Sequence, residues 1–334
     1  MSGKLTFGYL FDFRNPPQFR RKWDDLYAEI LDLVAWTEDA GFAGAWVPEH
    51  HLSEDGYIPS PLVALTAMAA RTSRIKLGSA IALAPLYNPV RFATDVAVLD
   101  IIARGRLEIG LAIGYRKRET AAFGVDFTRR GRMFDEWLEI VTRLWAGECL
   151  DYDGQWYQFK GAQLLPPAPR GRIPLYIGGF APKAVERVAR YGDGYVGSAE
   201  TFDGYAAKLA EQGRDPTSAK LRVTGLMTVV ATDRQAAIEE LSPHFHHVNN
   251  SYAEYFNEDK AMGQDSFTPM GLDAFKASGT MEILTPDEAI AKFKAMQAAM
   301  PLDHYMMMMP PGLPAERFQH YAEIFAREVM PAFR

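Results

Sequence analysis

Residues 45–56 read Ala-Trp-Val-Pro-Glu-His-His-Leu-Ser-Glu-Asp-Gly, and they decide how the rest of the chain is interpreted. A short apolar run over residues 43–47 stops at Pro48, and two histidines and three carboxylates follow it. This pattern indicates a buried strand that delivers titratable side chains to a loop at its carboxyl end. In parallel α/β proteins, that edge of the sheet is where ligands bind. The segment therefore predicts both a parallel sheet and the position of a candidate site.

The same alternation of apolar runs and amphipathic stretches recurs along the whole chain. Strands are predicted at residues 5–11, 43–47, 75–83, 106–113, 175–178, 194–197, 221–231 and 304–309. Helices are predicted at residues 24–40, 61–71, 89–103, 132–145, 182–191, 286–300 and 314–329. Eight predicted strands with seven predicted helices in a chain of 334 residues predict an α/β fold of the (β/α)8 TIM-barrel type with insertions.

A doubly wound open sheet is the alternative fold. It would carry a glycine fingerprint directly after its first strand, but Asp12-Phe13-Arg14 stands at that position. We therefore expect one barrel domain over residues 1–334. A small hairpin or extended excursion is expected at residues 153–159, and an irregular insertion at about 234–282, which is rich in His, Asn and Tyr after a helical start.

Composition narrows the class of partner. The net charge is −6 and no block of Lys or Arg dominates, which argues against a nucleic-acid or anionic-membrane partner. The single cysteine, Cys149, fits a reducing compartment. The chain has neither a signal-peptide pattern at its start nor an apolar run near the roughly 20 residues of a membrane helix. We expect a cytoplasmic protein.

The histidines admit two interpretations. On a strand, His50 and His51 would point to opposite sides, so only one of them can face the barrel mouth. That histidine is either catalytic or packed under a loop, and the residues alone leave both open. No second ligand pair completes a metal site with Glu49 and His50, and no metal is predicted. For His244, His246 and His247 a solvated surface is favoured over a metal site.

Two further segments have features of an anion-binding site. Residues 175–182, Leu-Tyr-Ile-Gly-Gly-Phe-Ala-Pro, combine a strand end, two glycines and a helix with proline in its first turn, an arrangement that suits phosphate. An ordinary tight turn is the alternative. Arg129, Arg130 and Arg132 precede a helix, where cations are mildly unfavourable unless an anion compensates them. A solvated basic turn is the alternative there. The run 306–309 of methionines is explained by core packing.

The motif at residues 49–56 also carries a family resemblance. Glu-His-His-Leu-Ser-Glu-Asp-Gly is similar to Glu-His-His-Phe-Thr-Glu-Phe-Gly of the luciferase α subunit, and residues 77–80, 88–91, 99–100, 105–107 and 328–331 add to the similarity. From residue 5 to residue 333 the chain resembles the bacterial-luciferase-like flavin-dependent monooxygenases. The resemblance implies a luciferase-like barrel that uses reduced FMN (FMNH2) and O2. Through a C4a-(hydro)peroxyflavin, such an enzyme would oxygenate a small apolar or carbonyl-containing organic substrate, with FMNH2 supplied by a separate flavin reductase.

The resemblance also implies roles for individual residues. His50 takes the position of the catalytic histidine, and Ala80-Ile81 takes that of a non-proline cis peptide that supports the flavin ring. The expected flavin-binding residues are Ala80, Ile81, Tyr115, Arg132, Gly178, Gly179, Phe180 and Ala181, with the last four at the phosphate and Arg130 as an alternative to Arg132. The expected substrate pocket comprises Phe11, Phe13, His51 and Tyr57. A homodimer is expected from the family.

Departures from the family pattern keep other functions open. Ala112 and Ile113 replace a reactive cysteine and an arginine, while Phe180 and Ala181 replace a glutamate and a serine, so light emission is not inferred. A dehydrogenase that uses the deazaflavin F420 is one alternative, although the Glu-His-His sequence favours FMN. A non-catalytic accessory subunit is another, and the presence of His50 argues against it, because such chains carry Asn there.

Overall fold

Eight parallel strands form a closed barrel in the computed structural model, which describes residues 4–179, 181–197, 202–259 and 267–334. The strand order is β1-β12-β9-β8-β7-β4-β3-β2. The strands span Thr6–Leu10 (β1), Gly44–Val47 (β2), Lys76–Leu83 (β3), Leu107–Ala112 (β4), Leu175–Gly178 (β7), Gly194–Val196 (β8), Leu221–Gly225 (β9) and Leu302–Met308 (β12). Each predicted strand overlaps one of these eight, and the predicted (β/α)8 barrel is confirmed.

The chain divides into two compact units. The first unit comprises Met1–Ala45, His50–Pro59 and Val223–Arg334, and the second comprises Trp46–Glu49 and Ser60–Arg222. Two of the four boundaries, at 45/46 and 222/223, fall inside the barrel strands β2 and β9, so each of these strands supplies residues to both units. Boundaries between independent domains usually fall in exposed linkers instead. One domain over residues 1–334 therefore stays our prediction.

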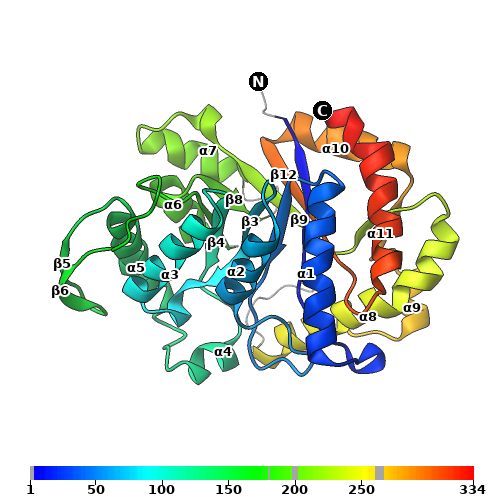
Figure 1. The fold of residues 1–334 in the computed structure, drawn as a ribbon, viewed down its shortest axis with the longest axis horizontal. Coiled ribbons are helices and arrows are strands. Elements are labelled where there is room, and N and C mark those ends of the chain that lie inside the picture. Colours follow the sequence, from blue (N-terminus) through cyan, green and yellow to red (C-terminus); the bar gives the residue numbers. More distant parts are fainter. Residues whose placement is uncertain (1–3, 180, 198–201, 260–266) are drawn as a thin grey trace. The chain divides into compact units, whose positions relative to one another are not determined.

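In the first unit, helices pack around the parallel pair β1 and β12, and α1 lies beside α11 (Figure 1). The helices span Trp23–Asp39 (α1), Arg234–Asp259 (α8), Leu272–Ala277 (α9), Pro286–Ala299 (α10) and Ala315–Ile324 (α11). Phe7 of β1 packs edge-to-face on Phe293, Phe325 and Phe333, with ring centroids 5.0 to 5.3 Å apart. The next residue, Gly8, has no room for a side chain, since a Cβ there would lie 2.2 Å from a backbone oxygen.

In the second unit, β3, β4, β7 and β8 form a continuous parallel ladder. Its helices span Pro61–Arg71 (α2), Pro89–Ile102 (α3), Lys117–Ala122 (α4), Arg130–Trp145 (α5), Pro182–Tyr191 (α6) and Phe202–Glu211 (α7). Helix α3 begins where Asn88 Oδ1 accepts two backbone N–H groups and proline occupies the first turn. The indole N–H of Trp145 on α5 donates to the Ala93 carbonyl of α3, which fixes these two helices together.

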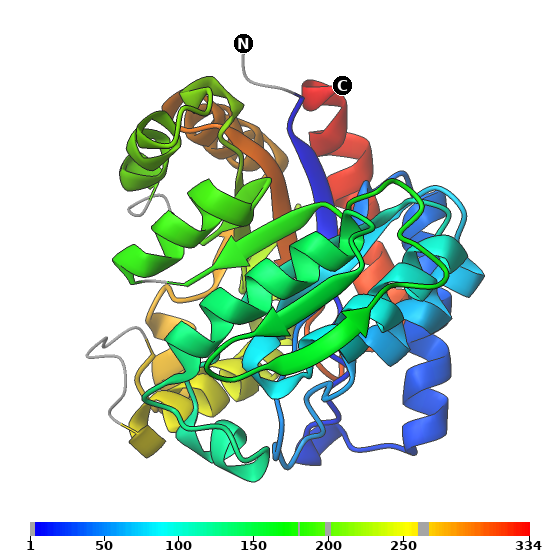
Figure 2. The same ribbon diagram turned by 90° about the vertical axis from the view of Figure 1, so that its left-hand side faces the viewer.

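The predicted hairpin is confirmed as the antiparallel pair Leu150–Asp153 (β5) and Gln158–Ala162 (β6). It lies outside helix α5 (Figure 2). The Glu136 carboxylate of α5 accepts the backbone N–H groups of Gln155 and Trp156 at 2.7 and 3.1 Å, which ties the hairpin turn to the helix.

Two predicted segments were wrong. The strand predicted at 221–231 is two strands, since a turn after β9 leads to Thr228–Val230 (β10), which pairs with Glu282–Leu284 (β11) outside the barrel. Most of the insertion predicted to be irregular is helical, because α8 runs through Pro243 and α9 follows it. Leu241, Phe245 and Val248 are buried at helical spacing, and this packing outweighs the helix-breaking proline.

Smaller differences concern helix ends. The helix predicted from residue 132 begins at Arg130, so Arg130 and Arg132 lie in its first turn. Helix α7 was not predicted, and the last predicted helix changes at Phe325–Val329 into a π-helical turn. The methionine run 306–309 is buried, as expected from core packing.

Candidate active site

Glu49, near the carboxyl end of β2, anchors the segment that follows β3. Its buried carboxylate accepts the backbone N–H of Leu83 at 2.7 Å and the hydroxyl of Tyr87 at 2.9 Å. Burial, together with the Glu49 carboxylate, raises the pKa of the Tyr87 hydroxyl far above its ordinary value, so this hydroxyl remains a donor. Both carboxylate oxygens of Glu49 therefore position the chain at the end of β3.

The peptide bond between Ala80 and Ile81 in β3 is cis, as the family resemblance implied. The pairing of β3 with β4 shifts in register between Ser79 and Ala82, so the strand bulges here. The Ile81 side chain reaches β7, where a Cβ added at Gly178 would lie 2.3 Å from Ile81 Cδ1. Gly178 thus makes room for Ile81, and two of the predicted flavin-binding segments contact each other.

The loop between β7 and α6 contains the predicted phosphate site. Gly179 has a φ of +140°, which favours glycine, and its carbonyl accepts the hydroxyl of Tyr195. Ala181 precedes the first turn of α6, which begins with Pro182. Phe180 lies outside the described residues. Backbone N–H groups at a helix start that follows glycine are suited to an oxyanion.

Tyr115 follows Gly114 in the loop after β4 and is half-buried. The Arg130 guanidinium donates from Nε to the Gly114 carbonyl at 3.1 Å and stacks 3.4 Å from the centroid of the Phe127 ring. Arg130 therefore holds the loop that carries Tyr115, whereas Arg132 is exposed.

Tyrosine rings surround His50 in the first unit. The His50 ring centroid lies 4.7 Å from that of Tyr57, 5.5 Å from that of Tyr255 and 6.2 Å from that of Tyr252. The backbone N–H of His50 donates to the Ile58 carbonyl at 3.2 Å, which closes the loop that carries Tyr57. His50 is only 6% exposed. The structure thus places an imidazole, which can exchange a proton near neutral pH, where little water reaches it.

A buried cation, Arg14, lies beside the same tyrosines. Its guanidinium carbon is 3.7 Å from the centroid of the Tyr57 ring and 5.4 Å from that of Tyr252. Its Nε faces a carboxylate oxygen of Asp12 at 3.4 Å and one of Asp55 at 3.7 Å. Burial raises the pKa of Asp12 to about 6, although the charge of Arg14 and the Arg14 backbone N–H oppose that shift.

Asp55 links this cation to helix α8. Its Oδ2 lies 2.7 Å from His247 Nε2, and its Oδ1 accepts the Ser53 hydroxyl at 2.6 Å and the backbone N–H of Tyr57 at 3.2 Å. Burial alone raises the pKa of Asp55, but the hydrogen bond with His247 and the charge of Arg14 outweigh burial and hold that pKa far below its usual range. Asp55 is therefore a carboxylate at neutral pH.

The other predicted pocket residues occupy different surroundings. Phe11 is fully buried and packs 6.0 Å from the ring of Phe318 on α11, while Phe13 packs 4.8 Å from the ring of Tyr27 on α1. His51 is half-buried next to His50. Of the four predicted pocket residues, Tyr57 is the one with a ring contact to His50.

Several site residues were missed at the sequence level: Asp12, Arg14, Asp55, Tyr252, Tyr255 and His247. Asp12 and Arg14 directly follow the first strand, which is the same signal that identified residues 49–56. For His247, Tyr252 and Tyr255 the spacing along α8 is the signal. That spacing is informative only if the segment is known to be helical. The solvated-surface interpretation of the histidines was wrong: His244 is buried and stacks 4.2 Å from Phe19, and His247 is held by Asp55.

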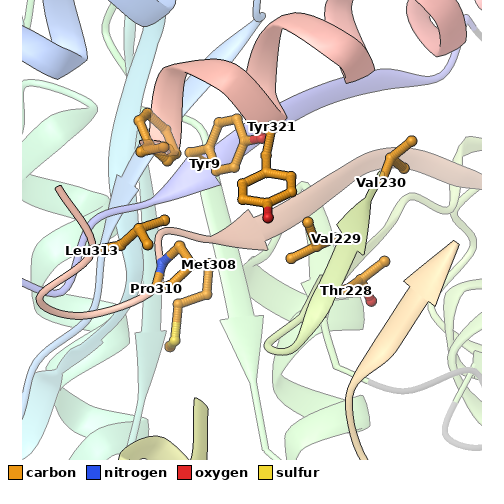
Figure 3. Close-up of a pocket in the computed structure, with 9 residues that line it drawn as sticks. Tyr9, Thr228, Val229, Val230, Met308, Pro310, Leu313 and Tyr321 are labelled. Carbon is orange, nitrogen blue, oxygen red and sulfur yellow. The ribbon is translucent and has the colours of Figure 1, made fainter. Parts of the chain in front are cut away.

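A small cavity in the first unit is too small to be a substrate site. Its volume of about 10 Å³ is near the minimum for one water molecule. It is lined by Tyr9, Thr228, Val229, Val230, Met308, Pro310, Leu313, Phe318 and Tyr321, and Figure 3 draws these side chains as sticks.

Neither a metal centre nor a membrane span is found in the described part of the chain. Within the ranges that the structure describes, no three His, Cys, Asp or Glu side chains are placed to hold a metal ion. Within the same ranges, no helix combines the length and the apolar character that crossing a membrane requires.

The fold and the site together define a class: a parallel (β/α)8 barrel with a non-proline cis peptide in its third strand and a histidine after its second. The sequence pattern of the luciferase-like monooxygenases matches residues 5–326. The chain therefore belongs to the luciferase-like monooxygenase family.

Individual relatives agree with this assignment. The oxygenase component of the flavin-dependent trigonelline monooxygenase of Acinetobacter baylyi is 26% identical over 92% of this chain and 90% of its own length. An F420-dependent glucose-6-phosphate dehydrogenase of Kineococcus radiotolerans is 30% identical over 59% of this chain and 60% of its own. The crystal structure of monooxygenase RslO1 from Streptomyces bottropensis has the same fold, with a TM-score of 0.84 and 24% identity over 98% of this chain and all of that one.

Proposed function

We propose that this chain is the oxygenase of a two-component monooxygenase, which uses FMNH2 and O2 to oxygenate a small organic substrate. The observation that carries the proposal is the contact between the cis peptide segment Ala80–Ile81 and Gly178, next to a glycine-containing helix start. These residues suit reduced FMN. The bulge in β3 interrupts the regular ladder, so backbone groups there are available to a polar ring edge, and the loop before α6 offers N–H groups to a phosphate.

Bound FMN would supply the activation of O2 and the transfer of one oxygen atom. We assign the flavin ring to Ala80, Ile81 and Tyr115, and the phosphate to Gly178, Gly179, Phe180, Ala181 and Arg132. We assign His50 to holding or moving a proton at the substrate, inside an aromatic enclosure that limits the access of water. The predicted substrate pocket remains Phe11, Phe13, His51 and Tyr57, with Tyr57 supported by its contact with His50.

Two partners belong to the same proposal. A separate flavin reductase would deliver FMNH2, which is supported by a relative described as an oxygenase component. A homodimer is also proposed, on the resemblance to the family alone.

The second candidate is an F420-dependent dehydrogenase, which would pass a hydride to the deazaflavin and involve no O2. It is supported by the F420-dependent relative, which is 30% identical over 59% of this chain. The Glu49-His50-His51 sequence and the relative that is 26% identical over 92% of the chain favour the monooxygenase.

An anaerobic titration separates the two candidates. The purified chain is titrated with FMNH2 and with reduced F420 while flavin and protein fluorescence are followed, and air is then admitted. The proposal expects tighter binding of FMNH2 and consumption of O2 after air is admitted. Preference for F420 with no O2 consumption would establish the dehydrogenase instead.

Reduced riboflavin, which lacks the phosphate, is the matched control ligand. Binding of FMNH2 that is at least tenfold tighter than that of reduced riboflavin would support a phosphate site before α6. Equal binding of the two would remove the phosphate from the assignment of Gly178, Gly179 and Ala181.

A further inference from the structure

Arg14 is a buried cation whose hydrogen-bonding capacity is largely unused. The residue is 1% exposed, and none of its three guanidinium nitrogens has a hydrogen-bond partner among the described residues. Its Nε faces the carboxylates of Asp12 and Asp55 at 3.4 and 3.7 Å, whereas within the described ranges Nη1 and Nη2 make no hydrogen bond. A buried donor without an acceptor costs about 1–3 kcal/mol, and more when it is charged. An arrangement this costly indicates a ligand.

The surroundings fix the orientation of the guanidinium. It stacks 3.7 Å over the Tyr57 ring, whose hydroxyl is hydrogen-bonded to that of Tyr252 at 2.9 Å. The carboxylate of Asp12 accepts the backbone N–H of Arg14 at 3.1 Å, and both acidic residues lie on the Nε side. The terminal nitrogens are therefore presented as a preorganised fork. That geometry matches the two oxygens of a carboxylate.

Tyr57 connects this fork with the candidate catalytic histidine. The guanidinium of Arg14 lies 3.7 Å from the centroid of the Tyr57 ring. The His50 ring centroid lies 4.7 Å from the same centroid. Arg14 and His50 therefore contact the same aromatic ring.

We propose that Nη1 and Nη2 of Arg14 bind a carboxylate of the substrate, so that the enzyme acts on small organic acids. This inference rests on the proposed function and deepens it, since it names the substrate class. Benzoate is a suitable probe, because its carboxylate matches the fork and its ring matches the tyrosine walls. Benzamide is the neutral comparison of the same shape.

Binding of an anion here is coupled to a proton. The titratable and charged groups that interact with Asp12 are Arg14 on its own loop, Asp55 and Tyr57 on the loop after β2, and His247 and Tyr252 on α8. A third carboxylate on Arg14, beside those of Asp12 and Asp55, adds negative charge close to Asp12. The pKa of Asp12 is already raised to about 6 and would rise further, so Asp12 takes up a proton. Benzoate affinity should therefore fall as the pH rises from 6 to 8, while that of benzamide should not.

The test is calorimetric titration of the full chain without flavin, so it succeeds or fails independently of the FMNH2 titration. The wild type should bind benzoate saturably and at least tenfold more tightly than benzamide. Arg14→Gln should lose benzoate binding at least tenfold, and the exposed control Arg91→Gln should not change it. Arg14→Lys keeps the charge beside Asp12 and Asp55 but lacks the two terminal guanidinium nitrogens. It replaces Arg14→Gln as the test of benzoate binding if Arg14→Gln fails to fold.

Three results would overturn the proposal: wild type that does not bind benzoate, equal binding of benzoate and benzamide, or unchanged benzoate binding in folded Arg14→Gln or Arg14→Lys. If neither variant folds, the comparison of the two ligands over pH in the wild type decides.

Discussion

His50 and Arg14 share one aromatic neighbour, the ring of Tyr57, so the candidate catalytic histidine and a buried charge contact the same side chain. An imidazole can accept or donate a proton, whereas an arginine keeps its charge at every physiological pH. Each residue can therefore be tested by a change that leaves the other in place.

His50→Ala should lower turnover by about 10²–10⁴-fold, the usual contribution of a general acid or base, and leave FMNH2 affinity within a few-fold. The measurement is steady-state O2 consumption with a substrate, beside the anaerobic flavin titration. His320→Ala, on an exposed position of α11, is the control. Unchanged turnover in His50→Ala would remove His50 from the mechanism.

Asp12→Asn should change how stability depends on pH. Burial raises the pKa of Asp12 to about 6 from an ordinary value of 3.8, so its contribution to stability is complete below pH 3.8 and is lost as the pH rises through 6. Between pH 4.5 and 7.5 the wild type should lose about 2 kcal/mol relative to the neutral variant. Urea unfolding at both pH values gives this difference, and parallel pH profiles would contradict it.

Helix α8 shows where prediction from sequence failed at the level of elements. Pro243 and a polar composition indicated an irregular segment, but a buried stripe of Leu241, Phe245 and Val248 holds the helix together. The barrel strands were predictable, since each is a short apolar run between turn residues. A polar helix that is stabilised by contacts with distant loops gives no such local signal.

The contact between Gly178 on β7 and Ile81 at the bulge in β3 predicts that substitutions at these two positions are energetically coupled. Gly178→Ala places a Cβ 2.3 Å from Ile81 Cδ1 and should destabilise the fold by about 1–3 kcal/mol through overpacking. Ile81→Val removes that Cδ1 and alone should cost about 0.5–1.5 kcal/mol. The double variant should be more stable than the sum of the single changes predicts, as measured by urea unfolding of all four proteins. Additive losses would show that the two side chains do not meet.

Across the whole molecule, the fold was predictable and the candidate site only partly. Local runs of apolar residues predict the alternation of strands and helices, and all eight barrel strands overlap a predicted strand. The contact between Asp55 and His247 spans 192 residues of sequence, and no local pattern predicts which helix meets which loop. The loops identified from sequence, at residues 49–56 and 178–181, are those whose candidate role rests on a short contiguous motif.

The two units should unfold together. β2 and β9 each contribute residues to both units, so neither unit can lose its strands without changing the other. Scanning calorimetry should show one transition, with the calorimetric enthalpy equal to the van't Hoff enthalpy. Two separated transitions would identify the units as independent domains.

The contacts that α8 makes have a consequence for how this protein can diversify. His247, Tyr252 and Tyr255 are encoded by one uninterrupted stretch of nine codons, and that stretch belongs to a helix outside the barrel ladder. A recombination between related genes with one crossover on each side of this stretch can therefore exchange the whole set of α8 side chains around His50 and Asp55 at once. Every barrel strand would be inherited unchanged, so the surroundings of His50 can change without rebuilding the scaffold.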